Sequence, residues 1–144
     1  MMRRPQPKVA FQGKAVTIAC TDKARSLRFY REVLGAEPLP GDEGYGCPWL
    51  RLGALTFSLL PNASGPCPVK FPTDAGAMLW LEVDDLGAAH RHLVQNGVPV
   101  VDQHEGVCMY VTDPDGLLIE IWQSQPESER RPAEPGTPPD RPRE

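Results

Sequence analysis

The chain has 144 residues, of which 40% are hydrophobic and 24% are charged, and its formal net charge is −4. This length supports one compact domain with its own core, and the acidic balance argues against a nucleic-acid partner and favours neutral or cationic small molecules. We expect no signal peptide, no membrane partner and a cytoplasmic location, because no apolar run is long enough to span a bilayer. The four cysteines show no CxxC spacing, which favours free thiols over a scattered disulfide framework.

The two ends of the chain differ in composition from the middle. Residues 1–12 and 126–144 are rich in Pro, Arg and Glu, and the second segment holds six of the seventeen prolines. Neither segment shows apolar periodicity, so both are predicted to be disordered. The folded domain is therefore expected over residues 13–125.

The first half of this domain, residues 14–61, has a β-α-β-β-β order. Asp22 is a predicted helix N-cap, and Gly35 stands where the helix would end. The predicted elements are a strand at 14–20, a helix at 24–34, and strands at 37–39, 48–52 and 55–60.

The second half, residues 76–123, repeats this order after a proline-rich stretch at 61–73. The helix-capping Asp22 and Asp85 lie 63 residues apart. The predicted elements are a strand at 77–83, a helix at 86–96 ended by Gly97, and strands at 98–101, 106–112 and 117–123. Two βαβββ modules of similar length indicate an internal duplication.

A tight turn and a buried strand end the second module. The turn, Asp113–Gly116, has proline at its second position and glycine at its fourth. The strand that follows is almost wholly apolar, and Glu120 is its only charge. A carboxylate in a buried strand is costly unless it is paired, hydrogen-bonded or bound to a metal.

Short motifs recur at matching places in the two modules. They are Val16–Asp22, Ser26–Tyr30 and Val33–Gly35 in the first, and Leu81–Leu86, Gly97–Val98, Asp113–Gly116 and Ile119–Ile121 in the second. In this order and spacing the chain resembles the glyoxalase / bleomycin-resistance / extradiol-dioxygenase superfamily, also called vicinal oxygen chelate proteins. The resemblance implies an α+β fold in which two tandem βαβββ modules form curled mixed sheets around a central cavity. It also implies that modules pair either within one chain or by exchange between the two chains of a homodimer.

Metal-dependent members of that superfamily hold a metal ion with His or Glu from the first and last strands of each module. Carried over residue by residue, these positions are Ala15, Ser58, Met78 and Glu120. Zinc, iron and manganese need three or four protein N or O ligands, and only Glu120 is one. We therefore predict no metal at this position, no cofactor, and no chemistry in which a metal polarises a substrate oxygen.

The three histidines do not replace the missing ligands. His90 and His92 are two residues apart on the second predicted helix, so they point to different sides. His104, with Glu105, lies just before a predicted strand, at the expected mouth of the cavity. It is a candidate ligand contact, and the alternative is an exposed loop histidine.

Alternation along the strands predicts which other residues share the face of the four superfamily positions. The cavity side is then Thr17, Ala19, Thr56, Leu60, Trp80, Glu82, Leu118 and Trp122. The opposite side is apolar throughout and should pack under the helices: Val16, Ile18, Phe57, Leu59, Leu79, Leu81, Ile119 and Ile121.

Two tryptophans and two acids on one face favour a ligand site. Trp80 and Trp122 offer stacking surfaces, and Glu82 and Glu120 offer acceptors or negative charge. At the rim of the cavity, two further aromatic side chains are candidates: Trp49 and Tyr110. The alternative is that the tryptophans merely fill the space left by a lost metal.

These patterns predict a metal-free protein without catalytic residues that binds and sequesters a small molecule, closest in type to bleomycin-resistance proteins. The expected ligand is planar or cationic, either an antibiotic or an aromatic metabolite. The alternative is a lyase, isomerase or dioxygenase-like enzyme whose divalent metal is held by Glu120 with His104, Glu105 or Glu82. A third possibility is a small-molecule sensor or interaction module that uses residues 126–144 to bind a partner.

Overall fold

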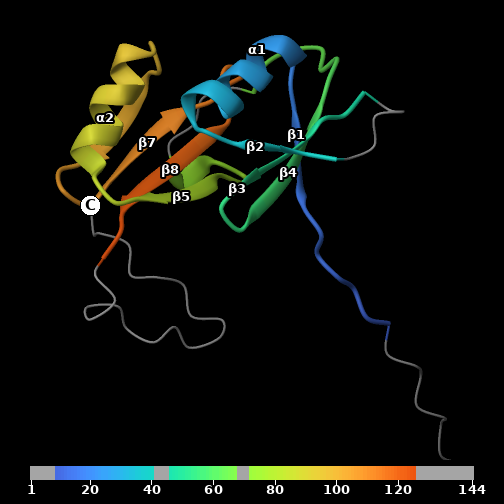
Figure 1. The fold of residues 1–144 in the computed structure, drawn as a ribbon, viewed down its shortest axis with the longest axis horizontal. Helices are drawn as coiled ribbons and strands as arrows, with labels where there is room; N and C mark the ends of the chain where they lie inside the picture. The colour runs from blue at the N-terminus through green and yellow to red at the C-terminus, as the bar shows by residue number, and fades with distance from the viewer. Residues whose placement is uncertain (1–8, 41–45, 68–71, 126–144) are drawn as a thin grey trace, which may run out of the picture.

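The computed structural model describes residues 9–40, 46–67 and 72–125, which form two βαβββ modules (Figure 1). The α+β fold predicted from the sequence is confirmed. The first module contains β1 (Val16–Ala19), α1 (Lys23–Arg28), η1 (Phe29–Val33), β2 (Glu37–Leu39), β3 (Trp49–Leu52) and β4 (Leu55–Leu60). The second contains η3 (Pro72–Asp74), β5 (Leu79–Val83), α2 (Leu86–Gln95), β6 (Val100–His104), β7 (Cys108–Thr112) and β8 (Leu118–Gln123).

Each module has its own four-stranded mixed sheet. The strand orders are β1-β4-β3-β2 and β5-β8-β7-β6, so the last strand of each module is central. That strand pairs in parallel with the first strand and antiparallel with the third. Among the described residues, no strand of one sheet pairs with a strand of the other.

The two helices begin as the sequence predicts. The side chain of Asp22 accepts a hydrogen bond from the Arg25 N–H at 3.1 Å, and that of Asp85 accepts one from Ala88 at 2.9 Å. Both N-caps satisfy a backbone donor that a helix leaves unpaired at its start. Gly97 follows the second helix with a φ of 72°, a conformation that glycine adopts without strain.

The predicted helix at 24–34 is confirmed as helix over residues 23–33, and its second half, residues 29–33, is a π-helical turn. The Leu34 N–H bonds to the carbonyl of Phe29, five residues back. The wider turn lets two consecutive aromatic residues, Phe29 and Tyr30, both face the core, with exposures of 7% and 0%.

The predicted strand at 98–101 is shifted along the chain. β6 starts at Val100, since Pro99 has no backbone N–H to donate to a strand ladder, and it continues to His104. His104 is therefore the last residue of a strand, and a turn with Gly106 at a φ of 73° connects it to β7.

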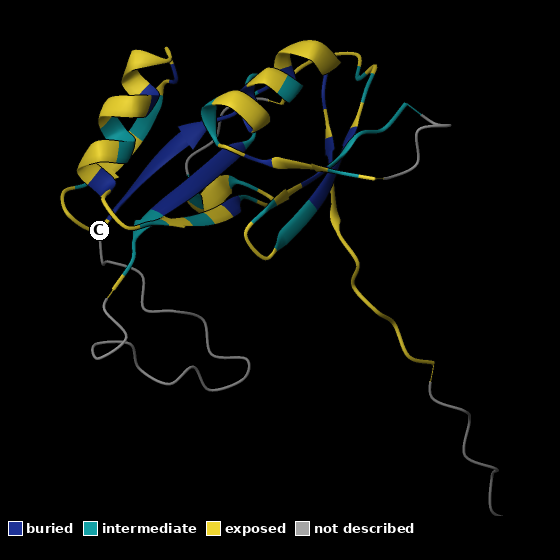
Figure 2. Cartoon of the chain, viewed as in Figure 1, coloured by how far each residue is buried: buried dark blue, intermediate teal, exposed yellow. Residues whose placement is uncertain are grey.

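One hydrophobic core joins the helix-facing sides of both sheets (Figure 2). Six of the eight residues predicted to pack under the helices are buried: Ile18, Phe57, Leu59, Leu79, Ile119 and Ile121. Leu81 is half-buried against the same core. Val16 is 44% exposed, so the prediction is wrong there, because β1 is an edge strand.

The two predicted disordered ends fall mostly outside the described residues, at 1–8 and 126–144. Residues 9–12 are exposed and belong to no helix or strand. The four cysteines are free thiols in the structure. No helix in the described ranges is long and apolar enough to cross a membrane.

Candidate functional site

The face of the second sheet opposite α2 carries most of the predicted site residues. We call it the helix-free face. Cross-strand register places Trp80, Glu120 and Tyr110 side by side on β5, β8 and β7. The neighbouring row, one step along the strands, is Glu82, Trp122, Cys108 and His104.

Glu120 lies at the centre of this face and is only 2% exposed. Its Oε1 accepts a hydrogen bond from the indole N–H of Trp122 at 2.6 Å and a longer one from the Tyr110 hydroxyl at 3.5 Å. Burial, reinforced by the charges of Glu120 and Asp102, raises the pKa of the neighbouring Cys108 thiol. The buried carboxylate is therefore satisfied by neutral donors, and a neutral thiol lies beside it.

The sequence suggested that Tyr110 lies at the rim of the cavity, but the structure does not place it there. It is 5% exposed and packs with Cys108 and Leu118 in a small cluster on this face. β7 lies next to the central strand, so its side chains on this face are covered by their neighbours.

Trp80 and Trp122 form a pair on the same face. Their ring centroids are 5.8 Å apart with an interplanar angle of 43°, and Trp80 is 42% exposed. Each indole has a flat apolar face for stacking, and the ring of Trp80 is the one open to solvent. Trp80 stands opposite Glu120 in the cross-strand register.

The remaining candidates lie on either side of the indole pair. Glu82 is exposed on β5, and its carboxylate accepts a hydrogen bond from Ser124 at 3.4 Å. His104 is half-buried on β6, with its ring edge-on to Tyr110 at 6.3 Å.

The corresponding face of the first sheet carries different side chains, among them an exposed ion pair of Arg51 with Glu37 at 2.7 Å. The hydroxyls of Thr17 and Ser58 lie 3.2 Å apart, and Ser58 is 4% exposed. Trp49, half-buried, stands opposite Ser58 on the neighbouring strand. Trp49 therefore belongs to the other sheet and is not part of the face around Glu120.

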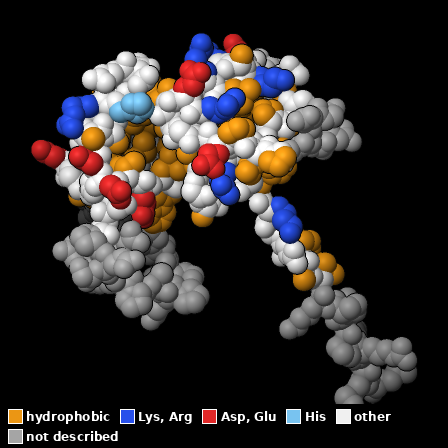
Figure 3. Space-filling view, viewed as in Figure 1, with side chains coloured by type: hydrophobic (Ala, Val, Ile, Leu, Met, Phe, Trp, Pro, Cys, Tyr) orange, Lys and Arg blue, Asp and Glu red, His pale blue; other side chains and the backbone are white. Residues whose placement is uncertain are grey.

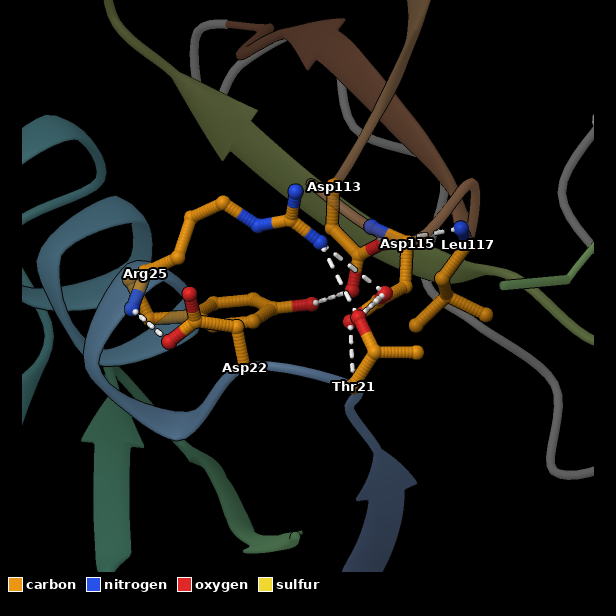
Figure 4. Close-up of polar contacts among 7 residues, drawn as sticks. Thr21, Asp22, Arg25, Asp113, Asp115 and Leu117 are labelled. Atoms are coloured by element: carbon orange, nitrogen blue, oxygen red, sulfur yellow. Dashed lines mark hydrogen bonds and ion pairs between the residues drawn. The ribbon is translucent and has the colours of Figure 1, made fainter. Parts of the chain in front are cut away.

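A polar network that the sequence did not identify joins the two modules (Figure 4). The Tyr30 hydroxyl donates to Asp113 Oδ2 at 2.8 Å, across 83 residues of chain. The other carboxylate oxygen of Asp113 accepts the N–H groups of Asp115 at 2.9 Å and Leu117 at 2.8 Å. Burial raises the pKa of Asp113, and burial also raises the pKa of Tyr30, so the hydroxyl stays protonated and can donate.

Asp115 makes the second half of this network. It is 3% exposed and accepts hydrogen bonds from the backbone N–H and the hydroxyl of Thr21. The guanidinium of Arg25 completes its shell at 3.2 Å. The turn before β8 thus clamps the second module onto the start of α1. In the sequence, Asp113 and Asp115 stand just before a buried strand, and this was the available signal for their role. The proline and glycine beside them had identified the segment only as a turn.

The sequence model of the Glyoxalase/Bleomycin resistance protein/Dioxygenase superfamily matches residues 14–121. The chain belongs to this superfamily. No curated protein matches the chain.

Solved structures of other proteins share the superfamily fold. A protein assigned to the glyoxalase family from Bacillus anthracis is 23% identical, with a TM-score of 0.62 over 83% of this chain and 100% of its own. The virulence protein STM3117 from Salmonella typhimurium is 24% identical, with a TM-score of 0.59 over 81% and 98%. The fosfomycin resistance protein FosX from Listeria monocytogenes is 12% identical, with a TM-score of 0.66 over 81% and 94%.

The superfamily's metal position does not fit a metal in this chain. Ala15, Ser58 and Met78 stand at three of the four ligand positions, and Oε1 of Glu120 is engaged by Trp122 and Tyr110. Within residues 9–40, 46–67 and 72–125, no three His, Cys, Asp or Glu side chains gather closely enough to hold an ion.

The alternative metal ligands considered from the sequence are Glu82, His104 and Glu105, and they do not gather around Glu120. Glu82 and His104 occupy the two edge strands of the sheet, β5 and β6. Three strand spacings of about 4.8 Å, or about 14 Å in all, separate the backbones of these two strands. Glu105 is exposed in the turn beyond β6. Among the described residues, Glu82, His104 and Glu105 form no group of three with Glu120 that could hold an ion in this conformation.

Proposed function

We propose that this chain binds a planar small molecule on its helix-free face and holds it without a metal. The ligand stacks on the indole pair of Trp80 and Trp122 and presents a polar or cationic edge to Glu120 or Glu82. This is the action of a sequestering protein, and it needs no catalytic residue.

The observation that carries the proposal is the indole pair beside a buried acid. The ring of Trp80 is 42% exposed and lies 5.8 Å from that of Trp122, whose N–H is bound to Glu120. A planar ring placed on an indole gains about 1 kcal/mol beyond the burial of its area, and a cation gains more. The acidic composition of the second module favours a cation over an anion at this face.

The superfamily membership supports a small-molecule ligand. One structural neighbour, FosX, is described as a fosfomycin resistance protein. At 12% identity this likeness supports the shared fold, so the ligand class proposed for this chain rests on its own residues.

We further propose that the chain acts as a homodimer in which the first module of one copy covers the helix-free face of the second module of the other. Within the described part of one chain the two sheets do not pair, and apolar residues remain exposed on the inferred cavity side, including Leu60 at 49% and Trp80 at 42%. Apolar side chains at such positions favour a partner surface. Sedimentation should give twice the 15.9 kDa chain mass, and a monomer at micromolar concentration would contradict exchange.

The binding test uses two planar probes that differ in charge, ethidium as a cation and riboflavin as a neutral ring system. Tryptophan fluorescence is titrated in the wild type and in Trp80→Ala and Trp122→Ala. Either substitution should weaken binding by about tenfold or more, because about 1.4 kcal/mol corresponds to tenfold. Glu120→Gln should weaken the binding of ethidium and leave the binding of riboflavin unchanged.

Val94→Ala is the control, since Val94 is 54% exposed on α2, on the opposite side of the second sheet. Affinities unchanged in both Trp80→Ala and Trp122→Ala would place the ligand elsewhere. An equal loss in Val94→Ala would also contradict this face.

A further inference from the structure

A cavity lies at the junction of the two modules. It is an open cleft of about 640 Å³, within the range of small-molecule sites. Its walls come from α1 and η1, from Pro66 and Cys67 after β4, from the loop after α2, and from the turn between β7 and β8. None of the candidate residues on the helix-free face lines it.

Among the charged side chains that line this cleft, the arginines are the ones available to a ligand. Arg25 and Arg28 line it from the same side of α1, three residues apart. Arg28 is exposed and has no hydrogen bond or ion pair within the described ranges. Arg25 gives one guanidinium nitrogen to Thr21 and Asp115 and stays 44% exposed.

The buried carboxylates of the cleft already accept hydrogen bonds from the protein itself. Both oxygens of Asp113 accept hydrogen bonds from Tyr30 and backbone N–H groups. Both oxygens of Asp115 accept hydrogen bonds as well, from Thr21 and Arg25. The remaining acid, Glu32, is exposed at the cleft and forms no ion pair with Arg28.

Much of the remaining wall is apolar: Phe29, Val33, Pro66, Val98 and Pro99. These side chains can receive the apolar body of a ligand whose charged group meets an arginine.

We propose that this cleft binds a small organic anion, a carboxylate or phosphate carried on an apolar body. Arg28 is its principal contact, because a free guanidinium matches both anions with two parallel hydrogen bonds. Arg25 adds charge, and the apolar wall receives the body of the ligand. Since the cleft spans both modules, a bound anion also stabilises their docking.

Isothermal titration calorimetry on the full chain tests the site with three probes: phenyl phosphate, phenylacetate and inorganic phosphate. The two aromatic anions distinguish phosphate from carboxylate, and both should bind more tightly than inorganic phosphate because only they bury an apolar ring. Arg28→Gln should weaken the binding of the better aromatic anion by about tenfold. Glu32→Gln should strengthen it by about twofold, since a like charge is removed.

Arg31→Gln is the matched control, because Arg31 is exposed next to Arg28 on the same helical segment but does not line the cleft. It should leave the affinity unchanged, and so should Trp80→Ala on the helix-free face. Equal weakening by Arg28→Gln and Arg31→Gln would overturn the proposal, because it would indicate diffuse attraction to a basic helix. No heat of binding with any probe up to about 10 mM would overturn it as well.

Discussion

The two modules share one scaffold but differ at the residues that can bind or hold something. Ser58 and Glu120 occupy the same place in the central strand of their sheets. In the first module the Ser58 hydroxyl meets only that of Thr17, at 3.2 Å. In the second, Glu120 holds the indole N–H of Trp122 at 2.6 Å.

The hairpin turns before the central strands differ as well. β3 and β4 are joined by Gly53 and Ala54 alone, and both residues are exposed. The turn between β7 and β8 is longer, and its two aspartates reach the first module. A longer turn with buried acids thus docks one module on the other, which the short turn cannot do.

Charge follows the same division. Residues 14–61 carry six basic and five acidic side chains, whereas residues 76–123 carry one basic and eight acidic ones. Figure 3 shows basic side chains over α1 and its neighbours, and acidic ones gathered over the second module. Duplication kept the apolar side of both sheets, whereas charged and hydrogen-bonding groups diverged between the modules. Only the apolar side is needed for each module to fold.

The largest expected effect is on the docking turn. Asp113→Ala should lower the free energy of unfolding by about 3 kcal/mol, because it leaves the buried Tyr30 hydroxyl and two backbone N–H groups without an acceptor. Urea denaturation at one fixed protein concentration measures this. Ala54→Ser in the short turn is the matched control and should change stability by less than about 0.5 kcal/mol. Similar losses in both turns would remove the distinction between them.

The central strands come next. Glu120→Ala should cost about 2 kcal/mol, because the Trp122 N–H loses its acceptor, whereas Ser58→Ala should cost about 1 kcal/mol or less. Glu120→Gln retains an acceptor oxygen and should recover most of the loss. Denaturation curves of the three variants decide this, and a Ser58→Ala loss as large as that of Glu120→Ala would show that the modules do not differ here.

The cross-module ion pair should contribute little. Arg25 is 44% exposed, so solvent screens its charge, and Arg25→Gln should cost about 0.5 kcal/mol. The cost should shrink in high salt, which thermal unfolding at two ionic strengths would reveal. A loss above about 2 kcal/mol would mean that Arg25, rather than the buried hydrogen bonds, holds the modules together.

The smallest effect is a pH slope from Asp113. Burial raises the pKa of its carboxyl in the folded chain, so the folded state takes up a proton more readily than the unfolded one. The stability from this group is complete below its unfolded pKa of about 4 and is lost as the pH rises through the raised folded value. The stability of Asp113→Asn relative to wild type should therefore increase from about pH 4 upward and then level off. A difference that stays constant with pH would contradict the raised pKa.

Periodicity and turn chemistry predicted most of the fold because they are local properties. Apolar alternation placed Trp80, Trp122, Glu82 and Glu120 on one face, and cross-strand register agrees with that placement. It did not predict that the Trp122 N–H would satisfy Glu120, because alternation specifies a face but not a side-chain rotamer. The parity rule also failed at Val16, since exposure depends on whether a neighbouring element covers the strand.

The sequence by itself determined the two βαβββ modules, the start of each helix, and which side of each sheet is apolar, because short-range spacing and capping encode these. Only the tertiary structure decided the roles of Asp113 and Asp115. Their partners Tyr30, Thr21 and Arg25 lie 83 to 94 residues away in the chain, and no local pattern connects them. The cleft at the module junction was likewise decided by the tertiary structure alone. Its walls come from four separate segments of both modules, so it exists only when the modules are docked.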